Sequence, residues 1–155
     1  MTTPDLLFAE YRLGIYRYLC RITGQADAAR DLTQDVFLRV TRAGIPETDA
    51  GGRKAWLFRI ARNLALNHLR DGHRRPVHVT LVERPSTATQ ELTLALSQAL
   101  ASLGELDRDV FLLRESGGLS YEEIAVACDL TVTAVRSRLH RARLHLRDAL
   151  SKELL

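Results

Sequence analysis

Apolar positions recur at helical spacing along nearly the whole chain. Leu32, Val36 and Val40 form an i, i+4, i+8 stripe that predicts a helix over about 27–42. The same kind of spacing predicts further helices over about 4–22, 53–70, 90–103 and 107–115. Residues 77–82 alternate weakly, as a strand does, but prolines and polar residues surround them. The hydrophobic pattern therefore predicts an all-α protein.

Two helices joined by a short turn are predicted near the C-terminus. Ser120 with Glu123 three residues later is a capping box, which predicts the start of a helix over 121–128. Asp129 stands in the predicted turn, where a short polar side chain tolerates a positive φ angle. Thr131 is expected to cap a second helix, which runs to about residue 150. A short helix, a tight connection and a basic second helix together predict a helix-turn-helix unit.

Helix-breaking and capping residues predict where other elements begin. Glycines and a proline predict that a loop separates the second and third helices: Gly44, Pro46, Gly51 and Gly52. Asp107 is expected to cap the N-terminus of the helix over 107–115.

The segment 72–90 has the composition of a linker, because proline, serine and threonine interrupt its periodicity. The chain is therefore predicted to form two small helical domains, 1–71 and 91–155, joined by a flexible linker over 72–90. Each domain has only about 65–70 residues, so each hydrophobic core is expected to be small.

Charge is strongly segregated, although the net charge is only +3. Basic residues dominate 53–84 and the segment from 131 to the end, and an acidic segment lies between them. This distribution indicates two places where a polyanion could bind. The alternative is that both basic segments are ordinary solvated helix faces.

The predicted second helix of the helix-turn-helix has one apolar and one basic side. Apolar residues spaced 3, 4, 3 and 4 form a seam for packing: Val132, Val135, Leu139, Ala142 and Leu146. The other side carries six side chains suited to DNA, the last of them at its flank: Thr133, Arg136, Ser137, His140, Arg141 and Arg138. Arginine pairs with guanine edges or phosphate, and serine and threonine bind either more weakly. This face is predicted to enter the major groove; the alternative is a basic bundle helix with its arginines in solvent.

The sequence contains no pattern typical of an enzyme. Cys20 and Cys128 are the only cysteines and are expected to be buried thiols, not a disulfide or zinc site. His68, His73 and His78 recur every five residues and do not share a helix face, so no metal is expected. The chain lacks a nucleophile–base constellation and a phosphate loop, which predicts no catalysis, no cofactor and no small-molecule substrate. No signal peptide or membrane span is apparent, so an intracellular protein is expected.

Two parts of the chain resemble the extracytoplasmic-function (ECF) group of bacterial sigma factors, in the sigma-70 family. The segment "GGLSYEEIAVACDLTVTAVRSRLHRARLHLRDAL" resembles region 4 of that group. The segments "DLTQDVFLRV" and "KAWLFRIARNLALNHLR" resemble region 2. The resemblance implies a cytoplasmic, nucleoid-associated protein that binds core RNA polymerase and directs promoter recognition, strand opening and transcription initiation.

The resemblance also implies roles for individual residues. Region 2 would dock on the clamp helices of the largest polymerase subunit through Asp31, Gln34 and Asp35, which lie off the buried stripe of their helix. It would bind the minus-10 element through Arg59, Arg62, Asn63 and Asn67. Region 4 would bind the minus-35 element through the six side chains named above for the predicted DNA face. An anti-sigma factor that holds the two halves together is a hypothesised partner.

Two other functions remain open. A stand-alone helix-turn-helix transcription regulator would explain the C-terminal half, but not the basic third helix that carries Asn63. A sigma-like adaptor that binds only proteins would leave the acid-free face of the last helix unexplained.

Overall fold

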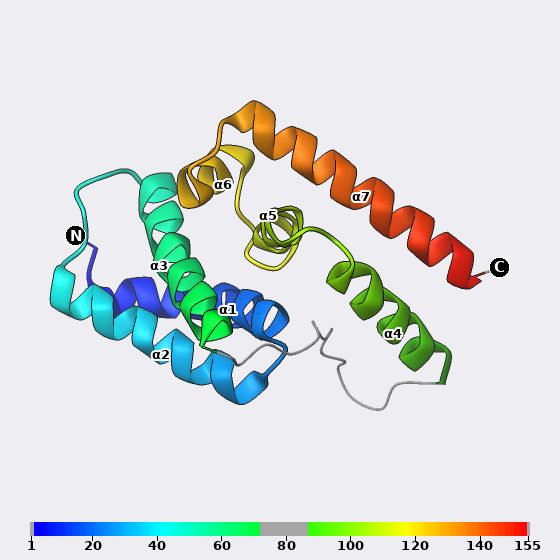
Figure 1. The fold of residues 1–155 in the computed structure, drawn as a ribbon. Coiled ribbons are helices and arrows are strands. Elements are labelled where there is room, and N and C mark those ends of the chain that lie inside the picture. The colour runs from blue at the N-terminus through cyan, green and yellow to red at the C-terminus, as the bar shows by residue number, and fades with distance from the viewer. Residues whose placement is uncertain (1, 72–86, 155) are drawn as a thin grey trace.

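The computed structural model describes residues 2–71 and 87–154 and forms seven helices from them (Figure 1). Within these two ranges there is no strand, so the prediction of an all-α fold is confirmed. In the same ranges, no helix combines the length and apolar character needed to cross a bilayer. The weakly alternating segment 77–82 and most of the predicted linker over 72–90 lie outside the described residues.

The N-terminal half consists of α1 (Pro4–Thr23), α2 (Ala26–Ala43) and α3 (Ala50–Arg70). The Thr3 side chain caps α1, and Gly24 ends it with a φ of 73°. The apolar stripe of α2 is buried, as its spacing predicts. The prediction of a loop through Gly51 and Gly52 is wrong, because Asp49 caps α3 by accepting a 2.7 Å hydrogen bond from the Gly52 amide. Both glycines therefore lie in the first turn of α3.

The C-terminal half consists of α4 (Thr87–Ala101), α5 (Glu105–Glu115), α6 (Tyr121–Cys128) and α7 (Val132–Leu154). The predicted bounds of α6 are confirmed, whereas α7 continues past residue 150. The prediction that Asp107 caps a helix is wrong. Helix α5 begins at Glu105, and the Asp107 carboxylate accepts a hydrogen bond from Arg138 of α7 instead.

The two halves pack directly against each other (Figure 1). Helix α1 packs on α2 and α3, and α7 packs on α4, α5 and α6. Between the halves, α3 contacts α6 and α1 contacts α5. One cluster of buried side chains runs through both halves, from Tyr18 and Phe58 to Leu113 and Ile124. The hydrophobic pattern of the sequence predicts a core for each half. It does not predict that the two cores merge into one.

Candidate nucleic-acid and polymerase interfaces

The connection between α6 and α7 has the geometry of a helix-turn-helix. In the predicted capping box, the Ser120 amide donates to Glu123 at 2.7 Å and the Glu123 amide donates to the Ser120 hydroxyl at 3.1 Å. Asp129 ends α6 in the left-handed region, with a φ of 57°. The Leu130 amide then donates to the Ala125 carbonyl at 2.9 Å, which closes the turn. These local bonds set the angle at which α7 leaves α6.

The left-handed conformation of Asp129 gives a testable prediction about this turn. Asp129→Val should lower the free energy of unfolding by about 1–2 kcal/mol, because a β-branched side chain clashes with the backbone at positive φ. Asp129→Gly and Asp129→Asn should lower the free energy of unfolding much less, because glycine and asparagine both tolerate a positive φ angle. Urea denaturation of the three variants measures the difference. Equal stability of the valine and glycine variants would contradict the role assigned to the turn.

Helix α7 buries its apolar seam and exposes most of the predicted DNA face. Val135, Leu139 and Ala142 are at most 1% exposed, which confirms the packing predicted from their spacing. Five of the six predicted minus-35 residues have exposed side chains: Thr133, Arg136, Ser137, His140 and Arg141. They form a polar surface without an acidic residue along the first half of the helix. Their contact with DNA stays a prediction.

Arg138, the sixth predicted residue, is held within its own half. Its guanidinium lies 2.8 Å from the Asp107 carboxylate of α5, and Arg141 lies 3.5 Å from the same carboxylate. Asp107 therefore links α5 to the predicted recognition helix. A carboxylate that pairs with one arginine and lies near a second limits where their side chains can reach.

The predicted minus-10 residues divide into two groups on α3. Arg59, Asn63 and Asn67 are exposed and follow one another at a spacing of four, so they lie along one side of the helix. Asn67 accepts a hydrogen bond from Arg70 at 2.9 Å. Arg62 is turned away from them, and only 19% of its side chain is exposed. The structure thus does not bring all four together on one open surface.

Arg62 belongs to a buried polar cluster that joins the two halves. Asp109 of α5 is 2% exposed, and it accepts hydrogen bonds from the Tyr18 hydroxyl of α1 and the Arg62 guanidinium of α3. Tyr18 itself is fully buried. We call these three residues the Tyr18–Asp109–Arg62 cluster. Because an ionised carboxylate inside a protein needs partners, Asp109 depends on groups supplied by the other half.

Burial dominates the electrostatics of this cluster. It raises the pKa of Asp109, and the charge of Arg62 opposes that effect only in part. Burial also raises the pKa of Tyr18, and the nearby Asp109 adds to the shift. For Arg62 burial works in the opposite direction, but the charge of Asp109 and its hydrogen bond leave the pKa raised. Tyr18 and Arg62 are therefore both protonated, and both donate to the carboxylate.

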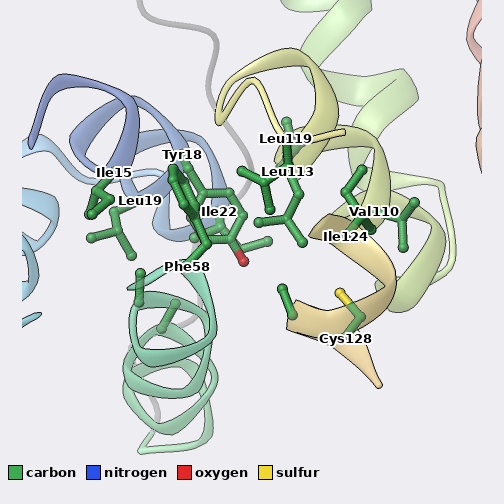
Figure 2. Packing of buried hydrophobic residues seen from close by; sticks show 14 of the residues in the cluster. Ile15, Tyr18, Leu19, Ile22, Phe58, Val110, Leu113, Leu119, Ile124 and Cys128 are labelled. Carbon is green, nitrogen blue, oxygen red and sulfur yellow. The ribbon is translucent and has the colours of Figure 1, made fainter. Parts of the chain in front are cut away.

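Cys128 of α6 lies beside the cluster, and its labelled side chain appears in Figure 2. Burial, followed by the charge of Asp109, raises the pKa of the Cys128 thiol to about 12. Cys20 and Cys128 are both buried, as the sequence predicts. A buried, protonated thiol reacts slowly with alkylating reagents.

The contact around the cluster is closely packed. Figure 2 shows Tyr18 and Phe58 of the N-terminal half opposite Leu113 and Leu119 of the C-terminal half. A Cβ atom added at Gly117 would lie 2.8 Å from the Phe58 ring and 2.7 Å from the Leu113 carbonyl oxygen. No other residue type fits at Gly117 without a shift of these neighbours.

A direct hydrogen bond also joins the two halves. The Lys54 ammonium donates to the Gly118 carbonyl at 2.7 Å. Lys54 lies near the start of α3, and Arg62 lies two turns later. The C-terminal half therefore accepts hydrogen bonds from two basic side chains, Lys54 and Arg62, of the helix that is predicted to bind DNA.

Sequence reasoning missed Asp109, although the pattern contained a signal. Asp109 lies three residues after Leu106 and four before Leu113, where an amphipathic helix places its core residues. Arg62 occupies the equivalent position four residues after the buried Phe58. A charged residue on an apolar stripe indicates that a partner is needed. It does not indicate which of many charged residues that partner is.

The residues predicted to dock on polymerase are exposed on α2. Asp31, Gln34 and Asp35 lie opposite the buried stripe of that helix. Gln34 also lines a groove between α1 and α2, whose apolar lining includes Phe8 and Leu13. Polar and apolar surface thus adjoin at this site, as in many protein–protein interfaces.

Two family models match the chain, the "Sigma-70 region 2" model over residues 7–75 and the "Sigma-70, region 4" model over residues 93–146. The ECF RNA polymerase sigma factor SigE of Mycolicibacterium smegmatis is 32% identical over 98% of this chain, which spans 63% of that protein's length. The ECF RNA polymerase sigma-E factor of Escherichia coli K12 is 31% identical over 90% of this chain and 82% of its own length.

A solved structure is also similar. CnrH in complex with the cytosolic domain of CnrY superimposes with a TM-score of 0.74 and 26% identity, covering 96% of this chain and 88% of CnrH. The resemblance of this sequence to regions 2 and 4 of ECF sigma factors is thereby confirmed. The chain belongs to the sigma-70 family of RNA polymerase sigma factors and, within it, to the ECF group.

Proposed function

We propose that this chain binds core RNA polymerase and directs it to promoter DNA, where it takes part in strand opening and transcription initiation. The observation that carries the proposal is the acid-free, exposed face of α7 in a complete helix-turn-helix, in a chain whose other half matches region 2. The chain would act as a specificity factor in the cytoplasm, at the nucleoid, and not as an enzyme.

The C-terminal half would recognise the minus-35 element through α7. Arg136 and Arg141 are exposed and can each bind a guanine edge or a phosphate. Ser137, His140 and Thr133 lie on the same face and would add weaker contacts. Arg138, which Asp107 holds, would reach only the backbone phosphates beside the helix.

The N-terminal half would bind the melted minus-10 strand through α3. Asn63 is exposed at the centre of the helix, and its amide can hydrogen-bond the edge of an unpaired base. Arg59 and Asn67, one turn away on either side, would bind the adjoining strand. Arg62 could join them only if its carboxylate partner moved away.

Polymerase would dock on α2. The exposed carboxylates of Asp31 and Asp35 can pair with basic side chains of the clamp helices, and Gln34 can contribute hydrogen bonds. The adjacent groove with Phe8 and Leu13 would add apolar contact area.

The division into domains 1–71 and 91–155 with a linker over 72–90 is part of this proposal. The two promoter elements lie apart on DNA, and a linker between the halves would let each half reach its own element. An anti-sigma factor is proposed as a further partner, because the similar CnrH is bound in its solved structure by the cytosolic domain of another protein.

In vitro transcription tests these roles together. Purified core polymerase with this chain and a promoter library should give specific start sites.

Arg141→Ala should lower the use of those promoters by about 5–150-fold, which corresponds to one base contact, and leave polymerase binding intact. Asp35→Ala should lower polymerase affinity and leave duplex binding by the chain unchanged.

The same assay distinguishes the alternatives. Duplex binding without any polymerase-dependent initiation would instead favour the stand-alone regulator. If neither activity occurred, the adaptor would be favoured. Equal loss of polymerase binding and promoter use in Arg141→Ala would contradict the role given to α7.

A further inference from the structure

The Tyr18–Asp109–Arg62 cluster connects the contact between the halves to the surface proposed for DNA. We propose that Asp109 competes with nucleic acid for Arg62, so that α3 offers its complete binding surface only after the halves separate. This inference rests on the proposed function, since it concerns the proposed minus-10 surface. It adds a device within the chain that controls that surface.

The first argument is geometric. Asp109 of α5 reaches across the contact and accepts hydrogen bonds from Arg62 of α3 and from Tyr18 of α1. The carboxylate is buried, and 19% of the Arg62 side chain remains accessible. A phosphate approaching α3 in this arrangement finds the guanidinium already paired with an anion.

The second argument is one of charge balance. A phosphate that displaced Asp109 while the halves stayed together would leave a buried carboxylate with the Tyr18 hydroxyl as its hydrogen-bond donor and only the weaker effect of the Arg108 charge to balance it. Such a stranded charge is strongly unfavourable inside a protein. When the halves separate, Asp109 returns to water and Arg62 is free to bind phosphate. The closed contact and the phosphate contact at Arg62 are therefore mutually exclusive.

The third argument concerns what remains open. Lys54 is also engaged by the C-terminal half, through the Gly118 carbonyl. Arg59, Asn63 and Asn67 stay exposed in the same arrangement. The closed form should therefore weaken strand binding by α3 and not abolish it.

Asp109→Asn tests the proposal, because the amide keeps the size of the side chain and removes its charge. Its NH₂ group would also face the donor groups of Arg62 or Tyr18. Glu122→Gln is the matched control, since it removes one exposed negative charge from the same half. Circular dichroism verifies that each variant remains helical.

Separation of the halves can be followed at Cys128, a buried residue at the end of α6, the helix that contacts α3, whose thiol lies within reach of the charges of Arg62 and Asp109. We expect Asp109→Asn to enlarge the radius of gyration in solution scattering and to raise the rate of iodoacetamide modification at Cys128 by at least about tenfold, the effect of one lost charged contact. Loss of the Asp109 charge also lowers the pKa of the Cys128 thiol directly, so the scattering distinguishes separation of the halves from that electrostatic effect. Peptide mapping by mass spectrometry separates Cys128 from Cys20, the internal reference, whose modification should not change. In Glu122→Gln, Cys128 should be modified at the same rate as in the unaltered chain.

Strand binding is measured with a fluorescein-labelled single-stranded oligodeoxynucleotide of mixed sequence. Asp109→Asn should bind it several-fold more tightly than Glu122→Gln does. The double variant Asp109→Asn with Arg62→Ala should keep the fast Cys128 modification and lose the gain in affinity. In Tyr18→Phe, which leaves the Asp109–Arg62 pair in place, iodoacetamide should modify Cys128 at a rate between those of the unaltered chain and Asp109→Asn.

Two results would overturn the proposal. One is a Cys128 rate in Asp109→Asn and Tyr18→Phe equal to that of the unaltered chain, which would show that the cluster does not hold the halves together. The other is a gain in affinity that persists without Arg62, which would show that Asp109 does not mask it. Polymerase-dependent initiation by the unaltered chain tests the proposed function separately, so the two failures are distinguishable.

Discussion

Phe58→Ala is expected to lower the free energy of unfolding by about 3–5 kcal/mol, as large-to-small changes of buried aromatic residues do. Phe58 is fully buried, and its ring packs edge-on against Tyr18 with centroids 6.1 Å apart. Gly117 from the other half lies directly against the same ring, so the neighbours cannot collapse into the space without moving two halves of the molecule. Urea denaturation followed by circular dichroism measures the loss.

Phe8→Ala is the matched control for this prediction. Phe8 is 38% exposed and packs against Phe37 at the edge of the N-terminal half. Because less of its apolar surface is buried than that of Phe58, Phe8→Ala should lower the free energy of unfolding by less than half as much as Phe58→Ala does. Similar losses for the two variants would show that Phe58 does not join the cores of the halves.

Arg62→Met should release the contact between the halves, because it leaves the buried Asp109 carboxylate with one neutral hydrogen-bond donor, Tyr18, and only the weaker effect of the Arg108 charge. Removal of one member of a buried ion pair typically costs about 3–5 kcal/mol. The molecule can avoid this cost by separating the halves and hydrating Asp109. We therefore expect fast alkylation of Cys128 and a larger radius of gyration in solution scattering.

A second substitution tests the reason for that effect. Adding Asp109→Leu to Arg62→Met removes the stranded charge and replaces the pair with apolar side chains, so slow Cys128 alkylation should return. Arg59→Met is the control, because Arg59 lies one turn earlier on α3 with its side chain exposed. If the double variant stays as open as Arg62→Met alone, the hydrogen bonds themselves hold the halves together and charge balance does not.

A polar cluster is well suited to a contact that must open. Buried ion pairs add little net stability compared with apolar residues of the same volume, but they penalise arrangements that leave one charge unpaired. The Tyr18–Asp109–Arg62 cluster therefore specifies one way for the halves to meet. A ligand that binds better to the separated halves can shift the equilibrium by its difference in affinity for the two states.

The sequence alone determined the helices and the helix-turn-helix. Capping at Ser120, the turn at Asp129 and the apolar seam of α7 each depend on residues within about four positions of one another, so local physics decides them. The segments that resemble regions 2 and 4 were enough to identify the family. The exposure of Asn63 and Arg136 also follows from helical periodicity once the apolar stripes are known.

Only the tertiary structure decided how the two halves meet and what that contact does to the candidate site. Arg62 belongs by sequence with Arg59 and Asn63, yet it pairs with Asp109, 47 residues away. Asp107, which the local pattern assigns to a helix cap, pairs with Arg138. The physical reason is the same in both cases. The chain specifies locally that a charge lies on a partly buried face, but its partner is chosen by the packing of helices far apart in sequence.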